Sequence, residues 1–391
     1  MSTPTGSKTA PIPYGRHSIA DDDVEAVVEV LRSDWLTTGP VVPEFERAFA
    51  GAAGSSHAVA VSSGTAALHA AMHALGVGPG DEVIVPPITF VSTANCAVFQ
   101  GARPVLADVE PDTLLVDPED VERKITPRTR AVIAVDYAGH PCDYDRLDEI
   151  AYRHGIALVA DACHSLGARF KGRPVGSLAR VSAFSLHPVK AITAGEGGVV
   201  TTDDPTLADR MSRFRNHGIS LTARDREARD TWIYEVTDLG YNYRITDIQC
   251  ALGLSQLRKL ERWTERRRQI ARRYDEMLRD LPQVEPLAVR PWAEPAYHLY
   301  VVRLNLPTLR VDRGEVFRRL RARGIGVNVH YIPVHLHPYY RERFGTGPGL
   351  CPVAEDAYER ILTLPLFPRM TDADVERVAG EVIAVLGECA R

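Results

Sequence analysis

The chain has 391 residues, of which 45% are hydrophobic and 25% are charged, and its formal net charge at pH 7 is -5. This length is too great for one small core and suits a large α/β domain with a smaller partner domain. The acidic balance argues against a nucleic-acid-binding protein, which would carry a basic excess.

The six cysteines are widely spaced and include no C-x-x-C pair, so we expect reduced thiols and no disulfide framework. Residues 1–13 are polar and lack the apolar stretch of a secretory signal. No run of about 18 apolar residues occurs, so we expect no membrane span. These features predict a cytoplasmic protein with neither a membrane nor a nucleic acid as partner.

A repeating strand–helix pattern dominates the first two thirds of the chain. Residues 1–12 are expected to form a mobile tail. Expected strands cover residues 57–62, 82–85, 103–107, 131–135, 156–160, 181–185 and 198–202. Expected helices cover residues 19–31, 43–50, 64–75 and 144–154. Because the strands are apolar at every position, we expect a mostly parallel sheet covered by helices on both faces.

The rhythm changes after about residue 245. A long or broken helix is expected over residues 246–278. A strand, a helix, a short strand and a last helix are expected over residues 297–304, 313–323, 327–330 and 372–386. The sequence therefore predicts a large domain over residues 13–245 and a smaller α+β domain over residues 246–391.

Lys190 is the first candidate functional residue. It lies in a Gly-rich turn between two expected strands and is followed by Ala191, Ile192, Thr193 and Ala194. A lysine nucleophile needs a partly neutral amine, which burial promotes. Most lysines are solvated surface residues, so the spacing alone leaves both interpretations open.

Asp161 directly follows an expected buried strand, where α/β proteins bind their ligands. A carboxylate there suits pyridoxal 5′-phosphate (PLP), whose protonated ring nitrogen is the better electron sink. Asp161 is alternatively a helix N-cap, and His164 a core histidine. Cys163 and His164 lack partners at zinc-ligand spacing, so we expect no metal site.

The turn Ser63-Gly64-Thr65-Ala66 links an expected strand to an expected helix, whose free N–H groups suit a phosphate. Phe90 follows another strand and offers a ring for stacking on a flat ligand, with core packing as the alternative. No P-loop, dinucleotide fingerprint, H-E-x-x-H motif or G-x-S-x-G elbow is present.

Taken in order, five segments resemble the sugar-nucleotide aminotransferases of the DegT/DnrJ family, a branch of the fold type I PLP enzymes. These segments are Gly64-Thr65-Ala66, Asp161-Ala-Cys-His164, Ser185 with Lys190, residues 195–198 and residues 239–249. The match runs from about residue 12 to residue 386. The resemblance implies a PLP-dependent transferase with a mostly parallel sheet in the large domain.

The resemblance also assigns roles to individual residues. Lys190 would form a Schiff base with PLP and then serve as the acid and base of the reaction. Asp161 would pair with the pyridine nitrogen, His164 would lie near the ring hydroxyl, and Phe90 would stack on the ring. The cofactor phosphate would be held by Gly64, Thr65, Ala66 and Ser185.

Two further cofactor residues, Asn242 and Arg244, would reach the phosphate of the neighbouring subunit's cofactor. That placement implies a homodimer with shared active sites. Substrate contacts implied by the resemblance are Thr38, His330, Tyr331, His335 and Tyr339.

The substrate implied by the resemblance is a nucleotide-linked keto sugar, with L-glutamate as amino donor. The most similar subgroup is the UDP-4-amino-4,6-dideoxy-N-acetyl-L-altrosamine transaminases, which aminate C4 of a UDP-linked 2-acetamido-2,6-dideoxy-4-keto sugar in pseudaminic acid synthesis. Residues 184–190, 251–257, 323–325 and 329–333 look like this subgroup. Ala194 departs from it, since a second threonine is usual there, so amination at C3 or C4 of a dTDP- or GDP-linked sugar is the alternative.

Two other classes of protein, a non-catalytic binding protein and a PLP enzyme with different chemistry, are alternatives to this interpretation. A non-catalytic binding or regulatory protein of the same fold would be expected to lose Lys190 or Asp161, and this chain keeps both. A β-eliminating or desulfurising PLP enzyme usually relies on an arginine clamp or a mobile cysteine, and no cysteine here stands in a suitable loop.

Overall fold

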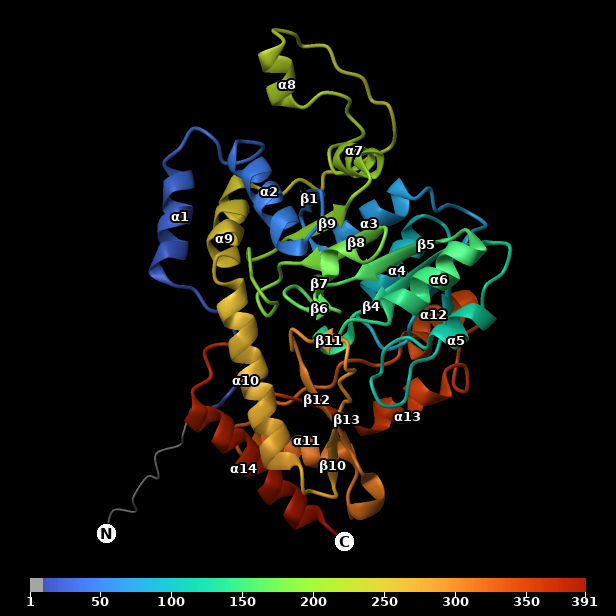
Figure 1. The fold of residues 1–391 in the computed structure, drawn as a ribbon, viewed down its shortest axis with the longest axis vertical. Coiled ribbons are helices and arrows are strands. Elements are labelled where there is room, and N and C mark those ends of the chain that lie inside the picture. The colour runs from blue at the N-terminus through green and yellow to red at the C-terminus, as the bar shows by residue number, and fades with distance from the viewer. Residues whose placement is uncertain (1–9) are drawn as a thin grey trace.

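The computed structural model describes residues 10–391, and Figure 1 shows a larger domain in its upper part and a smaller one below. Residues 1–9 of the predicted tail lie outside the described residues. Within the rest of that tail, Ile12 is buried and pairs in parallel with Ile325 of the smaller domain. The start of the described chain is therefore anchored on the smaller domain.

A seven-stranded sheet in the order β1-β9-β8-β5-β4-β2-β3 forms the centre of the larger domain. The strands are β1 (His57–Val61), β2 (Glu82–Val85), β3 (Arg103–Leu106), β4 (Thr129–Val135), β5 (Ala157–Asp161), β8 (Val181–Ser185) and β9 (Gly198–Thr202). From β3 to β8 all neighbours run parallel, and β9 is antiparallel to both β8 and β1. The predicted mostly parallel sheet is confirmed.

Helices cover this sheet and bury its apolar strands. They are α1 (Asp21–Leu31), α2 (Val41–Ala53), α3 (Gly64–Ala74), α4 (Ser92–Phe99), α5 (Pro118–Arg123), α6 (Tyr144–His154), α7 (Pro205–Phe214), α8 (Ala223–Ala228) and α9 (Asp247–Leu257). The alanines of α3 let it pack closely against β8 and β9. Helix α6 has the predicted bounds because Asp143 caps its start and Gly155, at φ 65°, ends it.

The smaller domain is built on the antiparallel sheet β10-β12-β13, with strands Val284–Pro286, Tyr300–Leu304 and Ile361–Leu364. Its helices are α10 (Leu260–Leu278), α11 (Arg313–Ala322), α12 (Pro338–Phe344), α13 (Pro352–Arg360) and α14 (Asp372–Cys389). A small sheet, β11-β6-β7 (Ala293–Glu294, Arg169–Phe170 and Arg173–Pro174), joins the two domains. Figure 1 shows α10 running from the larger domain along the smaller one.

One prediction that was left open is decided by the structure, and another is wrong. The helix expected over residues 246–278, long or broken, is broken at Arg258 and Lys259 into α9, which packs on α1 and α2, and α10. Residues 327–330 form no strand, and only Asn328 pairs with Thr363. A side chain of this segment also contacts β13, since His330 Nδ1 lies 2.9 Å from Thr363 Oγ1.

The division between the two hydrophobic cores lies within α10. Trp263 belongs to the core of the larger domain, whereas Ile270 and Tyr274 belong to the core of the smaller one. Among residues 10–391, no helix combines the length and apolar character needed to cross a membrane.

Candidate active site

A cavity of about 470 Å³ opens at the carboxyl ends of β4, β5 and β8, where the smaller domain closes over the sheet. Parallel α/β sheets bind their ligands at this edge. The lining residues come from several loops and from both domains: Tyr14, Ser63, Gly64, Thr65, Leu68, Thr89, Phe90, Ser92, Val135, Asp161, Cys163, His164, Ser185, His187, Val189, Lys190, Glu196, His298, His330 and Tyr331.

Lys190 reaches this cavity from the loop that follows β8. A backbone bond of 2.9 Å from its N–H to the carbonyl of His187 holds the turn. Burial lowers the pKa of the Lys190 amine, while Cys163 and Asp161 act in the opposite direction. The structure thus places Lys190 on a cavity wall, where a larger share of its amine is neutral than on an open surface.

Asp161 is the last residue of β5 and is buried at the cavity wall. Its Oδ2 accepts a hydrogen bond of 2.6 Å from Thr93 Oγ1, and its Oδ1 accepts one of 3.2 Å from the Cys163 N–H. No helix follows it, so Asp161 is not a helix N-cap. Among the described residues it has no basic ion-pair partner, which leaves a buried carboxylate facing the cavity.

His164 and Phe90 stand on the wall of the same cavity. Nε2 of His164 lies 3.2 Å from the Tyr331 hydroxyl, and its buried Nδ1 has no hydrogen-bond partner among the described residues. Burial and the nearby Lys190 lower the pKa of His164 well below its usual value, which keeps the imidazole neutral. Phe90 is 57% exposed, so its ring is available to a ligand and is not core packing.

The N-terminus of α3 forms the anion-binding part of the cavity. Ser63 Oγ caps the helix by accepting the Ala66 N–H at 3.1 Å, which occupies the Ala66 donor. None of the hydrogen bonds among the described residues uses the N–H groups of Gly64 or Thr65. A Cβ at position 64 would lie 2.9 Å from Ser185 Cβ, so glycine is what lets the end of β8 approach this helix.

These groups fit PLP by their chemistry. The buried Asp161 carboxylate suits a protonated ring nitrogen, and His164 Nδ1 has its bonding capacity available for a ring substituent. The N–H groups of Gly64 and Thr65 suit the phosphate. The structure thereby brings Gly64, Thr65, Phe90, Asp161, His164, Ser185 and Lys190 together around one space.

Three predicted site residues lie elsewhere in this chain. Thr38 and Arg244 line a second pocket of about 610 Å³, next to Arg215, and neither lines the cavity of Lys190. Asn242 is exposed near this second pocket and pairs with Asn216, which lines it. The prediction that Asn242 and Arg244 serve a neighbouring subunit is compatible with this separation but is not tested by it.

Of the substrate residues predicted between His330 and Tyr339, only the first two line the cavity. His330 and Tyr331 line the cavity, and burial lowers the pKa of His330 to about 4. His335 is 0% exposed, and its Nε2 lies 2.8 Å from Glu355 Oε1. Tyr339 is exposed on α12 and packs its ring against Tyr340. His335 of η4 (Val334–Leu336) and Tyr339 of α12 do not line this cavity in the chain, and their contact with a substrate stays a prediction.

Sequence analysis did not single out Thr93, which supports Asp161, or the cavity residues Tyr14 and His298. Thr93 in α4 holds Asp161, Tyr14 lies beside His330 with a ring-centroid distance of 5.4 Å, and His298 lies beside Lys190. Tyr14 and His298 come from segments far from the motifs in sequence. Only the docking of the smaller domain brings them to the cavity.

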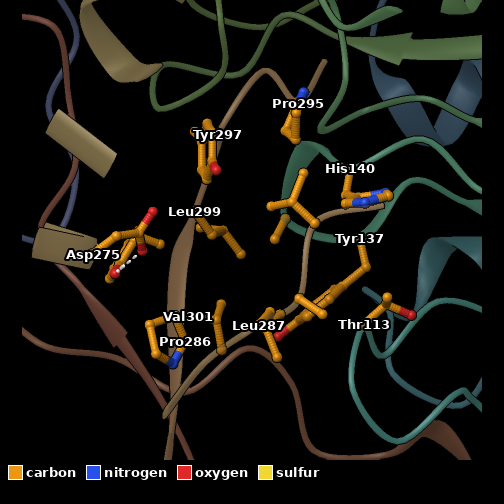
Figure 2. A pocket seen from close by; sticks show the side chains of 14 residues that line it. Thr113, Tyr137, His140, Asp275, Pro286, Leu287, Pro295, Tyr297, Leu299 and Val301 are labelled. Carbon is orange, nitrogen blue, oxygen red and sulfur yellow. Dashed lines mark hydrogen bonds between the residues drawn. The ribbon is translucent and has the colours of Figure 1, made fainter. Parts of the chain in front are cut away.

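A second, much smaller cavity of about 40 Å³ lies at the seam between the domains (Figure 2). His140 and Tyr137 face Leu299 and Val301 across it, and Asp275 Oδ1 accepts a hydrogen bond of 2.6 Å from the Tyr300 hydroxyl at its edge. This volume holds one or two waters and no larger ligand. This pocket is therefore too small to hold a cofactor or a sugar substrate.

A lysine and a carboxylate on the wall of one cavity, at the carboxyl edge of such a sheet, fit a PLP-dependent transferase. Comparison with known proteins identifies it more closely. The profile of the DegT/DnrJ/EryC1/StrS aminotransferase family matches residues 17–383. The chain belongs to this family and is a PLP-dependent sugar aminotransferase.

Relatives support this assignment over nearly the whole chain. The spore coat polysaccharide biosynthesis protein SpsC of Bacillus subtilis is 42% identical over 94% of this chain and 95% of its own. Spr1654 of Streptococcus pneumoniae, described as a sugar aminotransferase and solved in a PLP form, has a TM-score of 0.91 at 32% identity, covering 97% of this chain and 99% of its own. PseC of Helicobacter pylori, an aminotransferase involved in pseudoaminic acid biosynthesis, has a TM-score of 0.90 at 32% identity, covering 97% and 100%.

Proposed function

We propose that this aminotransferase moves the amino group of L-glutamate to the C4 keto group of a nucleotide-linked 6-deoxy sugar, a UDP-2-acetamido-2,6-dideoxy-4-keto-hexose. The observation that carries the transfer reaction is the presence of Lys190 and Asp161 on the wall of one cavity. The likeness to PseC, which serves pseudoaminic acid biosynthesis, supports the choice of sugar. A cytoplasmic location stays a prediction.

In this proposal each cavity residue has one task. PLP supplies the electron sink when it is bound. Lys190 binds the cofactor and moves a proton, and Asp161 holds a proton at the ring nitrogen. His164 donates or accepts at the ring hydroxyl, and Phe90 covers the ring. The N-terminus of α3 with Ser185 binds the phosphate.

The charge of the cavity supports a shared active site. Lys190 is the one lysine or arginine on the cavity wall among the described residues, although both substrates carry anionic groups. The second pocket holds Arg215, Arg224, Arg226 and Arg244 together with Thr38. We propose that a second copy of the chain places this arginine-rich pocket against the cavity, which brings Asn242, Arg244 and Thr38 to the partner's ligands.

The segment that would make this contact is residues 216–242, here called the arm. Figure 1 shows the arm with α8 projecting from the larger domain above α7. Its exposed apolar side chains include Trp232 at 85%, Ile233, Val236 and Leu239 at 74%. Such a concentration of exposed apolar surface is typical of an interaction site. The arginines at the base of the arm fit the anionic ligands of a second copy's cavity.

Replacing Trp232 and Leu239 by glutamate is expected to convert a dimer into a monomer, because two charges would be buried in an apolar contact. Light scattering after gel filtration measures the mass. The matched control is Tyr152→Glu on α6, an exposed aromatic residue outside the arm that should leave the mass unchanged. A wild-type protein that is monomeric at micromolar concentration contradicts the shared-site proposal.

The transfer reaction is tested by the absorption spectrum of the PLP-loaded protein. L-glutamate is expected to convert the band of lysine-bound PLP into the band of the aminated cofactor. A keto sugar that accepts the amino group should then restore the first band. UDP-, dTDP- and GDP-linked 4-keto and 3-keto sugars are compared in this second step.

The outcomes separate the alternatives. If the UDP-linked 4-keto sugar restores the band of lysine-bound PLP, the proposed substrate is supported. If only a dTDP- or GDP-linked sugar restores this band, that sugar is the substrate and the proposed one is wrong. A protein that binds PLP without any response to glutamate contradicts the transfer reaction and favours a binding or regulatory role.

A further inference from the structure

His298 contacts Lys190 although it lies far from every predicted site motif. It comes from the smaller domain, just before β12, and its Nε2 lies 3.5 Å from Lys190 Nζ. The imidazole is buried, and its ring centroid lies 4.5 Å from that of His164. A ring in this position limits where the Lys190 amine can move.

The surroundings keep this imidazole neutral. Burial lowers the pKa of His298 well below its usual value, and the nearby Lys190, His164, Arg267 and His330 act in the same direction. A neutral imidazole nitrogen accepts a hydrogen bond from an ammonium group or donates one to a neutral amine, depending on its tautomer. Because its pKa is so low, His298 is suited to hold the amine and not to keep the amine's proton.

Arg267 of α10 fixes the backbone that carries His298. Its Nη1 donates to the carbonyl oxygens of Tyr297, His298 and Leu366 at 3.3, 3.4 and 3.2 Å. Arg267 is buried, and burial lowers its pKa to about 10, so it stays charged at pH 7. Among the described residues it forms no ion pair with a carboxylate.

The backbone at this point is itself constrained. Tyr297 has φ 48°, in the left-handed region that a tyrosine rarely adopts. Strained residues of this kind persist where surrounding contacts hold them, and they cluster at functional sites. Together, Arg267 and the turn at Tyr297 fix the direction in which the His298 ring enters the cavity.

We propose that His298, held by Arg267, is a positioning residue for the Lys190 amine. The inference rests on the proposed function, in which Lys190 binds PLP and is set free when the cofactor takes up the amino group. His298 then holds the freed amine at the cavity through its Nε2, ready to receive or return a proton. Charged and titratable groups that face this pair are Asp161, Cys163, His164, Arg267 and His330.

The test compares three replacements that differ in their reach to Lys190. Gln places an amide oxygen close to the position of Nε2, Asn is one methylene shorter, and Phe keeps the ring without a polar atom. The PLP-free protein is labelled with acetic anhydride over a range of pH, and modification of Lys190 is quantified by mass spectrometry. Exposed Lys171 serves as the internal reference in every sample.

Loss of a hydrogen bond to the ammonium form should lower the pH midpoint of Lys190 labelling by about one unit in His298→Phe and His298→Asn. His298→Gln should restore the midpoint. In the PLP-loaded protein, the single-turnover rate of cofactor conversion by L-glutamate should fall by about tenfold in His298→Phe and His298→Asn. The rate should recover in His298→Gln. A packing role would give no such difference between Asn and Gln.

The outcomes distinguish this inference from the proposed function. If wild-type protein binds PLP and responds to glutamate while the Asn and Gln variants share the wild-type midpoint and rate, the role of His298 is refuted and the transfer reaction stands. If the midpoint shifts as expected but glutamate produces no spectral change in wild type, His298 still tunes Lys190 and the transfer reaction fails. Should His298→Phe not fold, the comparison of Asn with Gln decides alone.

Discussion

Lys190→Ala is expected to abolish amino transfer, with the single-turnover rate falling by at least about 10³-fold. The amine of Lys190 is the one lysine amine on the cavity wall among the described residues, and alanine removes both the cofactor attachment and the proton carrier. The absorption band of lysine-bound PLP should be absent even at saturating PLP.

The control for this variant is Lys171→Ala, which removes an exposed lysine paired with Asp145. It should keep both the band and the rate, which shows that the loss in Lys190→Ala does not come from general lysine reactivity. A Lys190→Ala protein that still shows the band would move the attachment to another lysine and refute the assignment.

Asp161→Asn is expected to lower the rate by about 10²- to 10⁴-fold. The variant leaves a cationic ring nitrogen without its buried partner, and breaking such a pair costs about 3–5 kcal/mol. The amide has nearly the shape of the carboxylate, so the hydrogen bond from the Cys163 N–H can persist and the fold should hold. Stopped-flow measurement of glutamate conversion, with PLP affinity measured separately, checks the prediction.

Thr93→Val is expected to reduce the rate less than Asp161→Asn does. It removes the 2.6 Å hydrogen bond to Asp161 Oδ2 but keeps the charge, so its effect should be about tenfold and clearly smaller. Equal losses in Asp161→Asn and Thr93→Val would indicate that the carboxylate acts through local structure and not through its charge.

Most strands of the larger domain, and the positions of several site residues at the strand ends, could be predicted from the sequence. Apolar runs bounded by turn residues predicted strands β2, β8 and β9 with their observed bounds. Gly64, Asp161, Ser185 and Lys190 each follow or end such a run. Strands β5 and β8 are parallel neighbours, and β1 runs in the same direction with the antiparallel β9 between it and β8, so the carboxyl ends of all three strands share one edge. Local pattern therefore predicted where these residues lie, whereas their roles came from the resemblance to the family.

The residues that cover this edge could not be predicted from local sequence. His298, Tyr14 and Tyr331 reach the cavity because the smaller domain docks on the sheet, and no local pattern encodes that docking. His335 lies only five residues after His330 in the sequence. His330 lines the cavity, whereas His335 is buried beside Glu355.

Burial and orientation of this kind depend on contacts between segments that are far apart in sequence. The spacing of hydrophobic residues and a helix-capping residue predict the structure of their own segment only. The direction of a loop side chain depends instead on the residues that pack against it. The separation of Thr38 and Arg244 from Lys190 became visible for the same reason, since distance across the molecule is a property of the assembled fold. The sequence thus determined which groups can do the chemistry, and the packing of the two domains determined which of them face it.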